Sequence, residues 1–313
     1  MVERARKGKQ IMTRLRQIIN ASNLGEHGLR LIGTTDIDGN GTTHEIADVD
    51  PIVLFDFATF NTRDESSFRP HPHLGLTAMS FLPVNGTWMA WDSLKGETEA
   101  HLHAGGLYYV HAGSPAFHHE FPSPETVAAE MDVEFVQLVW NSTDEENVET
   151  VVIQPEDVPV VTLENATVRV LAGEFCGVKS VQPFTHRKIV YAYVQLQNGK
   201  AVDLQVPSSF RGILFVIEGK LKVNDVTVDE QQMMILGDED QTLSITDLGT
   251  NSVGRFIIAA GEPLNKPFYK LIGLGGFIIG KTEEEVRRRM EEFAVEADQL
   301  KAEIPQYFPK QHL

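Results

Sequence analysis

The sequence is poor in cysteine, in long apolar runs and in positive charge. Cys176 is the only cysteine among 313 residues, so no intrachain disulfide can form and nothing suggests an oxidising compartment. No apolar run approaches the roughly 18 residues of a membrane span. Lysine and arginine number 27 against 44 acidic residues, a formal net charge of −17. Because nucleic-acid affinity depends on basic groups at phosphates, we expect no direct binding to DNA or RNA. We expect a cytoplasmic protein, with the nucleus as the alternative.

What remains is the composition of an ordinary globular protein, 42% hydrophobic and 23% charged. The acidity has one exception at the N-terminus. Arginine and lysine are frequent in residues 1–16, and Ile11, Leu15, Ile18 and Ile19 follow at helical spacing. This predicts a basic amphipathic helix within residues 1–25 that packs on the body. A cleaved organelle-targeting segment is the alternative, against which the early acid Glu3 argues.

From about residue 51 onward, short β-branched and aromatic runs alternate with Gly, Pro and Asn, a texture typical of an all-β protein. Asn85-Gly86 is a turn candidate. The expected strands fall in two sets with similar patterns. The first comprises residues 77–84, 87–91, 107–110 and 133–140, and the second 190–196, 212–217, 220–223, 233–236, 243–245 and 255–260.

The two sets predict two barrels or sandwiches joined by an acidic, Pro-containing crossing at residues 154–159. We therefore expect domains at 26–160 and 161–313. Near the C-terminus, Thr282 stands three residues before Glu285, and Val286, Met290 and Phe293 follow on one face. This predicts a terminal helix at about 283–300.

Histidine is concentrated in one stretch: seven of the 11 histidines lie between His71 and His119. Alternate residues of a strand share a face, so His71 and His73 should point to one side, as should His118 and Glu120. Two such pairs on neighbouring strands would form a site of three nitrogens and one carboxylate. Such a donor set suits iron, manganese, nickel, copper or zinc. The alternatives are two surface histidines in a Pro-rich loop, and a rim carboxylate at Glu120.

Other histidines in this stretch are rivals or neighbours. His101 and His103 alternate with Glu97 and Glu99, which would allow a second metal on one strand face, although a solvated outer face is the simpler interpretation. His119 should turn away from His118 and Glu120 and lie behind the site or at the surface. We leave open whether His111 touches the pocket or is a hydrogen-bonded core residue.

Several motifs together resemble the pirin family in order and spacing. They are residues 69–75 (Arg-Pro-His-Pro-His-Leu-Gly), 91–94 (Trp-Asp-Ser-Leu), 112–114 (Ala-Gly-Ser), 117–122 (Phe-His-His-Glu-Phe-Pro) and 260–264 (Ala-Gly-Glu-Pro-Leu). The resemblance covers roughly residues 53–294. It implies a bicupin, two tandem cupin-type β-barrels with short terminal helices. It also implies one metal, commonly iron, held by His71, His73, His118 and Glu120 in the N-terminal barrel.

The resemblance implies more than one function. Several pirins act as quercetin 2,3-dioxygenases, which would make this chain an iron-dependent oxidoreductase for a flavonol-like aromatic substrate, with Glu120 as metal ligand and general base. Other members are nuclear transcriptional cofactors or redox sensors that act through protein partners. A metal that only supports the fold is a third reading. Family membership does not choose between these functions.

The chain also departs from the family pattern. Most pirins have His-Pro-His-Arg-Gly-Phe-Glu where this chain has Leu74 and Thr77 in place of the Arg and the Glu. The ligand residues are retained, but the polar groups that would orient a substrate or tune iron differ. After His186 the next histidine is His312, so we expect a metal-free C-terminal barrel. No heptad repeat or long apolar run requires association, and we expect a monomer.

Overall fold

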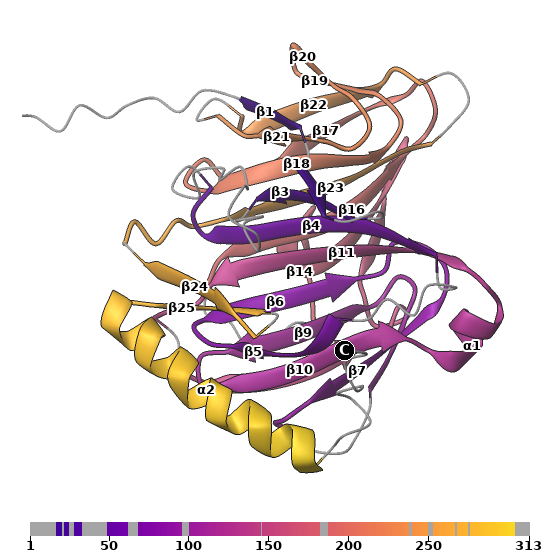
Figure 1. Ribbon diagram of the computed structural model, residues 1–313. Coiled ribbons are helices and arrows are strands. Elements are labelled where there is room, and N and C mark those ends of the chain that lie inside the picture. Colours follow the sequence, from indigo (N-terminus) through magenta and orange to yellow (C-terminus); the bar gives the residue numbers. More distant parts are fainter. Residues whose placement is uncertain are drawn as a thin grey trace, which may run out of the picture.

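The protein folds into two β-barrels packed side by side, as a computed structural model of the chain shows (Figure 1). The structure describes residues 17–20, 22–24, 28–32, 49–61, 68–95, 100–144, 146–181, 187–237, 240–249, 253–266, 268–274 and 276–303. Within this part of the chain the all-β fold predicted from the sequence is confirmed. Neither helix in these ranges has the length and apolarity required of a membrane span.

The N-terminal barrel consists of two antiparallel sheets and one short helix, α1 (Pro124–Ala128). The larger sheet has the order β12 (Val148–Ile153), β9 (Leu107–Ala112), β6 (Leu76–Phe81), β11 (Asp132–Asn141), β4 (Ile52–Asn61), β3 (Gly28–Ile32) and β2 (Ser22–Leu24). The smaller has the order β5 (Phe68–His73), β10 (Ala116–Pro122), β7 (Thr87–Asp92) and β8 (Ala100–His103). Asn85 and Gly86 both have positive φ, 60° and 77°, and form the turn before β7 that their sequence predicts.

The C-terminal barrel repeats this arrangement. Its larger sheet has the order β1 (Gln17–Asn20), β21 (Gln232–Ile235), β18 (Arg211–Glu218), β23 (Gly254–Gly261), β16 (Ile189–Leu196), β14 (Ala166–Phe175) and β13 (Val160–Thr162), with β15 (Val178–Lys179) beside β14. Its smaller sheet has the order β17 (Ala201–Gln205), β22 (Thr242–Asp247), β19 (Leu221–Val223) and β20 (Val226–Val228). In this strand order β17 and β22 take the places that β5 and β10 take in the first barrel.

The expected N-terminal helix is wrong for the described residues of that segment. Residues 17–20 form β1, which pairs with β21 of the C-terminal barrel and so takes the place that β12 has in the first barrel. Ile19 is buried in the core while Ile18 is only half-buried. Residues 22–24 form β2. Adjacent residues on a strand point to opposite faces of the sheet, so only one of the two isoleucines is buried. Their spacing also fits a helix, and for this reason the sequence pattern predicted the wrong element. Residues 1–16, which carry most of the basic charge, lie outside the described residues.

The C-terminal segment crosses back to the N-terminal barrel. The hairpin of β24 (Tyr269–Gly273) and β25 (Gly276–Gly280) lies beside β5, and α2 (Glu283–Glu303) runs across the same side of the barrel (Figure 1). The helix begins at the expected residue, where the Thr282 hydroxyl accepts a hydrogen bond from the Glu285 N–H at 3.1 Å. The division expected at residues 161–313 therefore differs from the packing, because residues 269–303 cover the first barrel. The apolar face of α2 must be buried, and packing against the first barrel buries it.

A single apolar cluster joins the two barrels. Phe215 on β18 packs against Phe55 and Phe57 on β4, with ring centroids 5.1 and 5.4 Å apart. Beside it, Arg255 on β23 forms a bidentate ion pair with Glu134 on β11, at 2.6 and 2.7 Å. This shared core makes the relative position of the barrels part of the fold.

Candidate metal centre

Three imidazoles converge inside the N-terminal barrel. His71 and His73 lie on β5, and the antiparallel register with β10 places His118 directly opposite His71. The Nε2 atom of His118 is 2.8 Å from Nε2 of His71 and 2.9 Å from Nε2 of His73. At most 6% of any of these side chains is exposed. The predicted sharing of one face by His71 and His73 therefore holds, and Pro72 lies within a strand rather than a surface loop.

Hydrogen bonds between the three rings cannot satisfy all of the Nε2 atoms in this cluster. The Nδ1 atom of His73 donates a hydrogen bond to the carbonyl oxygen of Phe277 at 3.2 Å, so in the neutral ring its Nε2 carries a lone pair. A proton on Nε2 of His118 would have to be shared between two neighbours. Nitrogens about 2.1 Å from a common ion and at right angles to each other would lie about 3.0 Å apart. The observed separations fit that requirement, and three imidazoles are donors for a divalent transition metal.

The histidines are also in the protonation state that a metal requires. Burial lowers the pKa of His73 to about 3, with a further contribution from His71, and the hydrogen bond to Phe277 opposes the shift. Burial likewise lowers the pKa of His118 well below its usual range, with His71 and His73 adding to the effect. Neutral imidazole is the metal-binding form, so no proton has to be displaced from these two rings at neutral pH.

Glu120 lies beside the cluster rather than within it. Its carboxylate is not among the atoms that lie within 4.8 Å of one another, and its Oε2 is 3.7 Å from Nδ1 of His118. Burial raises the pKa of Glu120 to about 7, and the Ser80 hydroxyl lowers it only in part. Both shifts of the His118–Glu120 pair favour neutral groups, so the metal-free pair is not an ion pair.

The Glu120 carboxylate is poorly satisfied in the interior. Neither of its oxygens has a well-formed hydrogen bond in the described part of the chain, although the nearby Ser80 hydroxyl lowers its pKa, and Nδ1 of His118 also lacks a partner there. A fully buried carboxyl with so little hydrogen bonding is costly, and a bound cation would satisfy it. This observation fits the predicted ligand role, which stays a prediction.

A carboxylate that the sequence reasoning did not assign lies beneath the histidines. Asp92, opposite His118 on β7, accepts a hydrogen bond from Thr150 at 2.9 Å and a longer one from the Tyr108 hydroxyl at 3.4 Å. The Tyr108 ring stacks on His118 with centroids 6.1 Å apart. Burial, then the charges of Asp92 and Glu120, raise the pKa of Tyr108 well above its usual value. Tyr108 therefore stays protonated and keeps its hydrogen bond to Asp92.

The rival histidine pair is placed elsewhere. His101 and His103 are exposed on β8, and the Thr87 hydroxyl lies 3.0 Å from Nδ1 of His103. Glu97 and Glu99 lie outside the described residues, so the proposed second site is not tested as a whole. His119 is buried and stacks on Phe121 at 4.5 Å, and it is not one of the three clustered imidazoles.

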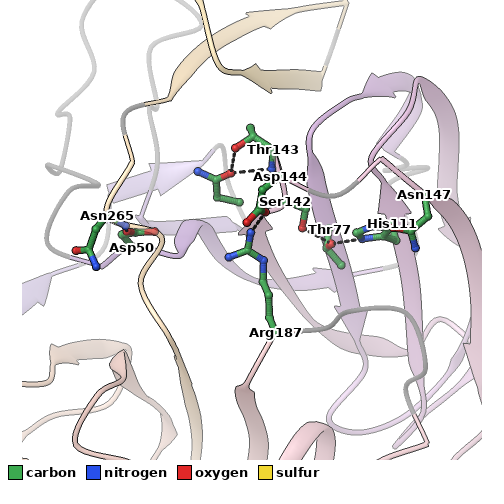
Figure 2. A network of polar contacts seen from close by, with 10 residues as sticks. Asp50, Thr77, His111, Ser142, Thr143, Asp144, Asn147, Arg187 and Asn265 are labelled. Atoms are coloured by element: carbon green, nitrogen blue, oxygen red, sulfur yellow. Dashed lines mark hydrogen bonds and ion pairs between the residues drawn. The ribbon is translucent and has the colours of Figure 1, made fainter.

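His111 belongs to a separate polar network at the seam between the barrels (Figure 2). Its Nδ1 is 2.7 Å from the Thr77 hydroxyl, which is 2.7 Å from the Ser142 hydroxyl, and its Nε2 is 3.1 Å from the Asn147 side-chain oxygen. His111 shares a strand face with Tyr109 of the inter-barrel core, opposite the face that lines the metal cluster. Of the two readings left open by the sequence, the hydrogen-bonded core histidine is the correct one.

Thr77 is one of the two departures from the family pattern. Its hydroxyl contacts His111 and not the three clustered histidines. Nearby in Figure 2, Asp144 of the first barrel forms an ion pair with Arg187, which precedes β16 of the second. The seam network therefore contributes to holding the barrels together and presents no donor to the three histidines.

A polar cleft of about 220 Å³ opens at the end of the barrel next to the metal cluster. Its walls come from the turns after β5, β9 and β11 and from the start of α2: Leu74, Gly75, Gly113, Ser114, Pro115, Thr143, Glu146, Ile279, Gly280, Lys281, Glu285 and Arg289. Leu74, the other departure from the family pattern, lies in this wall directly after His73 of the histidine cluster. The cleft is smaller than the roughly 300–1,000 Å³ of typical ligand pockets.

Comparisons with known sequences agree with the resemblance stated above. Residues 191–296 match a family model described as the pirin C-terminal cupin domain. Human Pirin is 27% identical over 246 residues, which is 77% of this chain and 80% of the human protein. Pirin-like protein 2 of Arabidopsis thaliana is 23% identical over 258 residues, covering 78% of this chain and 74% of the relative.

Solved structures show the same fold. The quercetin 2,3-dioxygenase of Acinetobacter baumannii matches with a TM-score of 0.75 and 23% identity, covering 90% of this chain and 96% of that one. The bacterial pirin YhhW of Escherichia coli, solved in complex with nickel(II), matches with a TM-score of 0.59 and 14% identity, covering 80% and 99%. At such identities the likeness extends to the fold and not to the reaction.

Proposed function

Since this chain belongs to the pirin family of cupin proteins, we propose that its N-terminal barrel holds one divalent transition metal and acts as a dioxygenase of the quercetin 2,3-dioxygenase type. Iron(II) is the first candidate, with manganese, nickel, copper and zinc as alternatives. His71, His73 and His118 are the proposed nitrogen ligands, and Glu120 is the proposed oxygen ligand. The convergence of three buried Nε2 atoms at 2.8 and 2.9 Å is the observation that supports the site.

The chemistry assigned to the chain's own residues is limited to binding and proton transfer. A bound metal ion would polarise a coordinated hydroxyl or dioxygen in a site that the surrounding barrel keeps dry. Glu120, whose carboxylate lies 3.7 Å from Nδ1 of His118, is the proposed acceptor of the proton of a flavonol hydroxyl. The Tyr108 hydroxyl donates to Asp92. Neither task requires a group from the C-terminal barrel.

One observation favours the alternative, a non-enzymatic metal-dependent redox sensor or transcriptional co-regulator acting through protein partners. The ligand side chains are at most 6% exposed, and the cleft of about 220 Å³ is lined by their neighbours rather than by the histidines themselves. A flavonol that entered by this cleft would have to displace part of its wall to reach the histidines. A protein partner that binds the outer surface and responds to a metal-dependent change there needs no such opening.

The deciding experiment is oxygen uptake by anaerobically iron-loaded protein given quercetin and a small flavonol panel. The His71→Ala, His73→Ala double variant removes two proposed ligands. The matched control is the His101→Ala, His103→Ala double variant, which removes a pair with the same spacing from the exposed face of β8. We expect uptake by the parent and the control, and none by the ligand variant.

Metal content separates the remaining outcomes. Stoichiometric iron in the parent without uptake by any variant would reject the dioxygenase and support the redox-sensing alternative. A parent that binds no iron, manganese, nickel, copper or zinc would reject the metal centre itself. In the Glu120→Gln variant we expect partial metal retention with loss of turnover, and unchanged turnover would reject Glu120 as the base.

A further inference from the structure

The C-terminal hairpin contacts the strand that carries two of the three histidines. Phe277 on β25 accepts the hydrogen bond from Nδ1 of His73 through its backbone carbonyl, and its ring stands edge-on to the His73 ring at 5.7 Å. The Lys270 ammonium on β24 lies 4.3 Å from the centre of the Phe277 ring. It also donates a hydrogen bond to the Val53 carbonyl oxygen at 3.5 Å. A segment more than 150 residues from the ligands in sequence therefore determines which nitrogen of His73 faces the cluster.

The hairpin can come this close only because glycines stand at the crossing points. A Cβ atom on Gly276 would lie 2.8 Å from Cδ2 of His71 and 2.8 Å from the carbonyl oxygen of Pro72, both inside van der Waals contact. Gly75, with φ +71°, lies under β25 in the same way, and a Cβ there would be 2.2 Å from the Ile279 carbonyl oxygen. Beside it the Ile279 N–H donates to the Leu74 carbonyl at 2.9 Å.

Helix α2 holds the hairpin in place from outside. Its apolar face, Val286, Phe293 and Ala297, is buried against Ile278 of the hairpin and Phe117 of β10. Phe293 and Phe117 meet edge to face at 5.3 Å, one residue before the ligand His118. The hairpin is thus packed between the helix and the ligand strands and has no freedom to withdraw without breaking this cluster.

We propose that the β24–β25 hairpin is a structural part of the metal centre, with Phe277 as the positioning residue for His73 and Gly276 as the residue that lets His71 occupy its ligand position. The carbonyl of Phe277 keeps the proton of His73 on Nδ1 and leaves the Nε2 lone pair for the ion. The N-terminal barrel alone is an incomplete site. This inference rests on the metal centre of the proposed function, but not on any reaction there.

The test compares two alanine substitutions in the one hairpin. Gly276→Ala places a methyl group against His71 and Pro72, whereas Gly273→Ala, at the paired position on β24, meets the flexible end of Met290 at 3.0 Å. Both add the same methyl group to the same element. Cobalt(II) is the probe, because its visible absorption reports the ligand set and its affinity can be measured by competition with a chelator. We expect Gly276→Ala to weaken cobalt binding about 10–100-fold and to shift the absorption, and Gly273→Ala to change affinity less than about threefold.

Each outcome bears on a different claim. Equal affinity and equal spectra for the two variants, with the parent binding cobalt, would overturn the hairpin's role and leave the metal centre standing. Failure of the parent to bind would overturn the metal centre and the inference together. Thermal unfolding of the metal-free variants shows whether either has lost its fold. If Gly276→Ala is unfolded, nitrogen-15 NMR of the metal-free parent decides, since His73 must be the Nδ1–H tautomer and finding Nε2–H would overturn the proposal.

Discussion

The two barrels have the same strand order, but the paired strands that carry histidine in the first carry aliphatic residues in the second. In the N-terminal barrel His71 on β5 stands opposite His118 on β10. At the matching place in the C-terminal barrel, Leu204 on β17 stands opposite Leu243 on β22, and both are buried in an apolar cluster. A second barrel without metal stays a prediction.

The difference shows that the fold supplies a geometry and a few side chains supply the chemistry. Two antiparallel strands facing the interior of a barrel place alternate residues within a few ångström of each other in both halves. With leucine there, the pair contributes apolar burial at about 25 cal/mol per Å². With histidine there, the metal-free protein gives up that contribution and buries an Nδ1 atom of His118 that has no hydrogen-bond partner among the described residues. If the first barrel holds a metal as proposed, it exchanges stability for that site, and the metal should restore part of the loss.

The largest expected effect concerns whether the barrels behave as one unit. Phe215→Ala removes the ring that packs on Phe55 and Phe57 in the other barrel, and we expect a loss of about 3–5 kcal/mol in unfolding free energy. Because this ring belongs to the shared core, calorimetry should resolve two transitions in place of one. The metal should then shift only the transition of the N-terminal barrel.

Phe256→Ala is the matched control for that experiment. Phe256 is also fully buried, but it lies in the core that belongs to the C-terminal barrel alone. We expect a similar loss of free energy with a single transition retained. Two transitions in both variants, or in neither, would show that the shared cluster does not couple the barrels.

A reciprocal exchange between the barrels should have the next largest effect. Leu243→His places an imidazole in an apolar interior with no second histidine nearby, and we expect a loss of about 2–4 kcal/mol without metal binding. His118→Leu removes a ring whose Nδ1 has no hydrogen-bond partner among the described residues. We expect the metal-free variant to differ from the parent by less than about 1 kcal/mol, because added apolar burial offsets the partner that His71 and His73 lose, while cobalt binding is lost.

Chemical denaturation of the metal-free proteins measures both changes. If His118→Leu were as destabilising as Leu243→His, the histidine cluster would be a source of stability in its own right. The interpretation that the buried histidines lower the stability of the metal-free first barrel would then be wrong.

Much of the fold follows from sequence patterns that act over short distances. The runs at 107–110, 133–140 and 255–260 lie within β9, β11 and β23, because β-branched and aromatic residues bounded by Gly, Pro and Asn report a strand locally. That His71 and His73 share one face of their strand follows equally from the two-residue period of a strand. The N-terminal segment did not, because Ile18 and Ile19 fit a helix pattern as well as a strand, and only pairing with β21 across 200 residues decides between them.

The part of the site that the sequence could not predict is contributed from a distance. Phe277 acts through its backbone carbonyl, which any residue would supply, and Gly276 acts through the absence of a side chain. Neither leaves a pattern in the local sequence. Asp92 was visible as part of a family motif, but its place opposite His118 depends on the register of β7 with β10. The position of Glu120, 3.7 Å from the far nitrogen of His118, likewise depends on the bulge between residues 118 and 120.

The smallest effect in this comparison is the pH dependence that Glu120 gives to the first barrel. Burial raises its pKa to about 7 from 4.5, so between these values the metal-free folded protein keeps a proton that the unfolded chain releases. Stability should therefore fall as pH rises from 4.5 to about 7 and stay level above it, by up to about 3 kcal/mol. Glu120→Gln cannot release the proton. We expect it to match the parent near pH 4 and to exceed the parent's unfolding free energy above pH 7, as measured by urea unfolding with the metal removed. A difference between parent and variant that is constant from pH 4 to 8 would mean that water or another group already satisfies the carboxylate, and the case for an ion beside Glu120 would weaken accordingly.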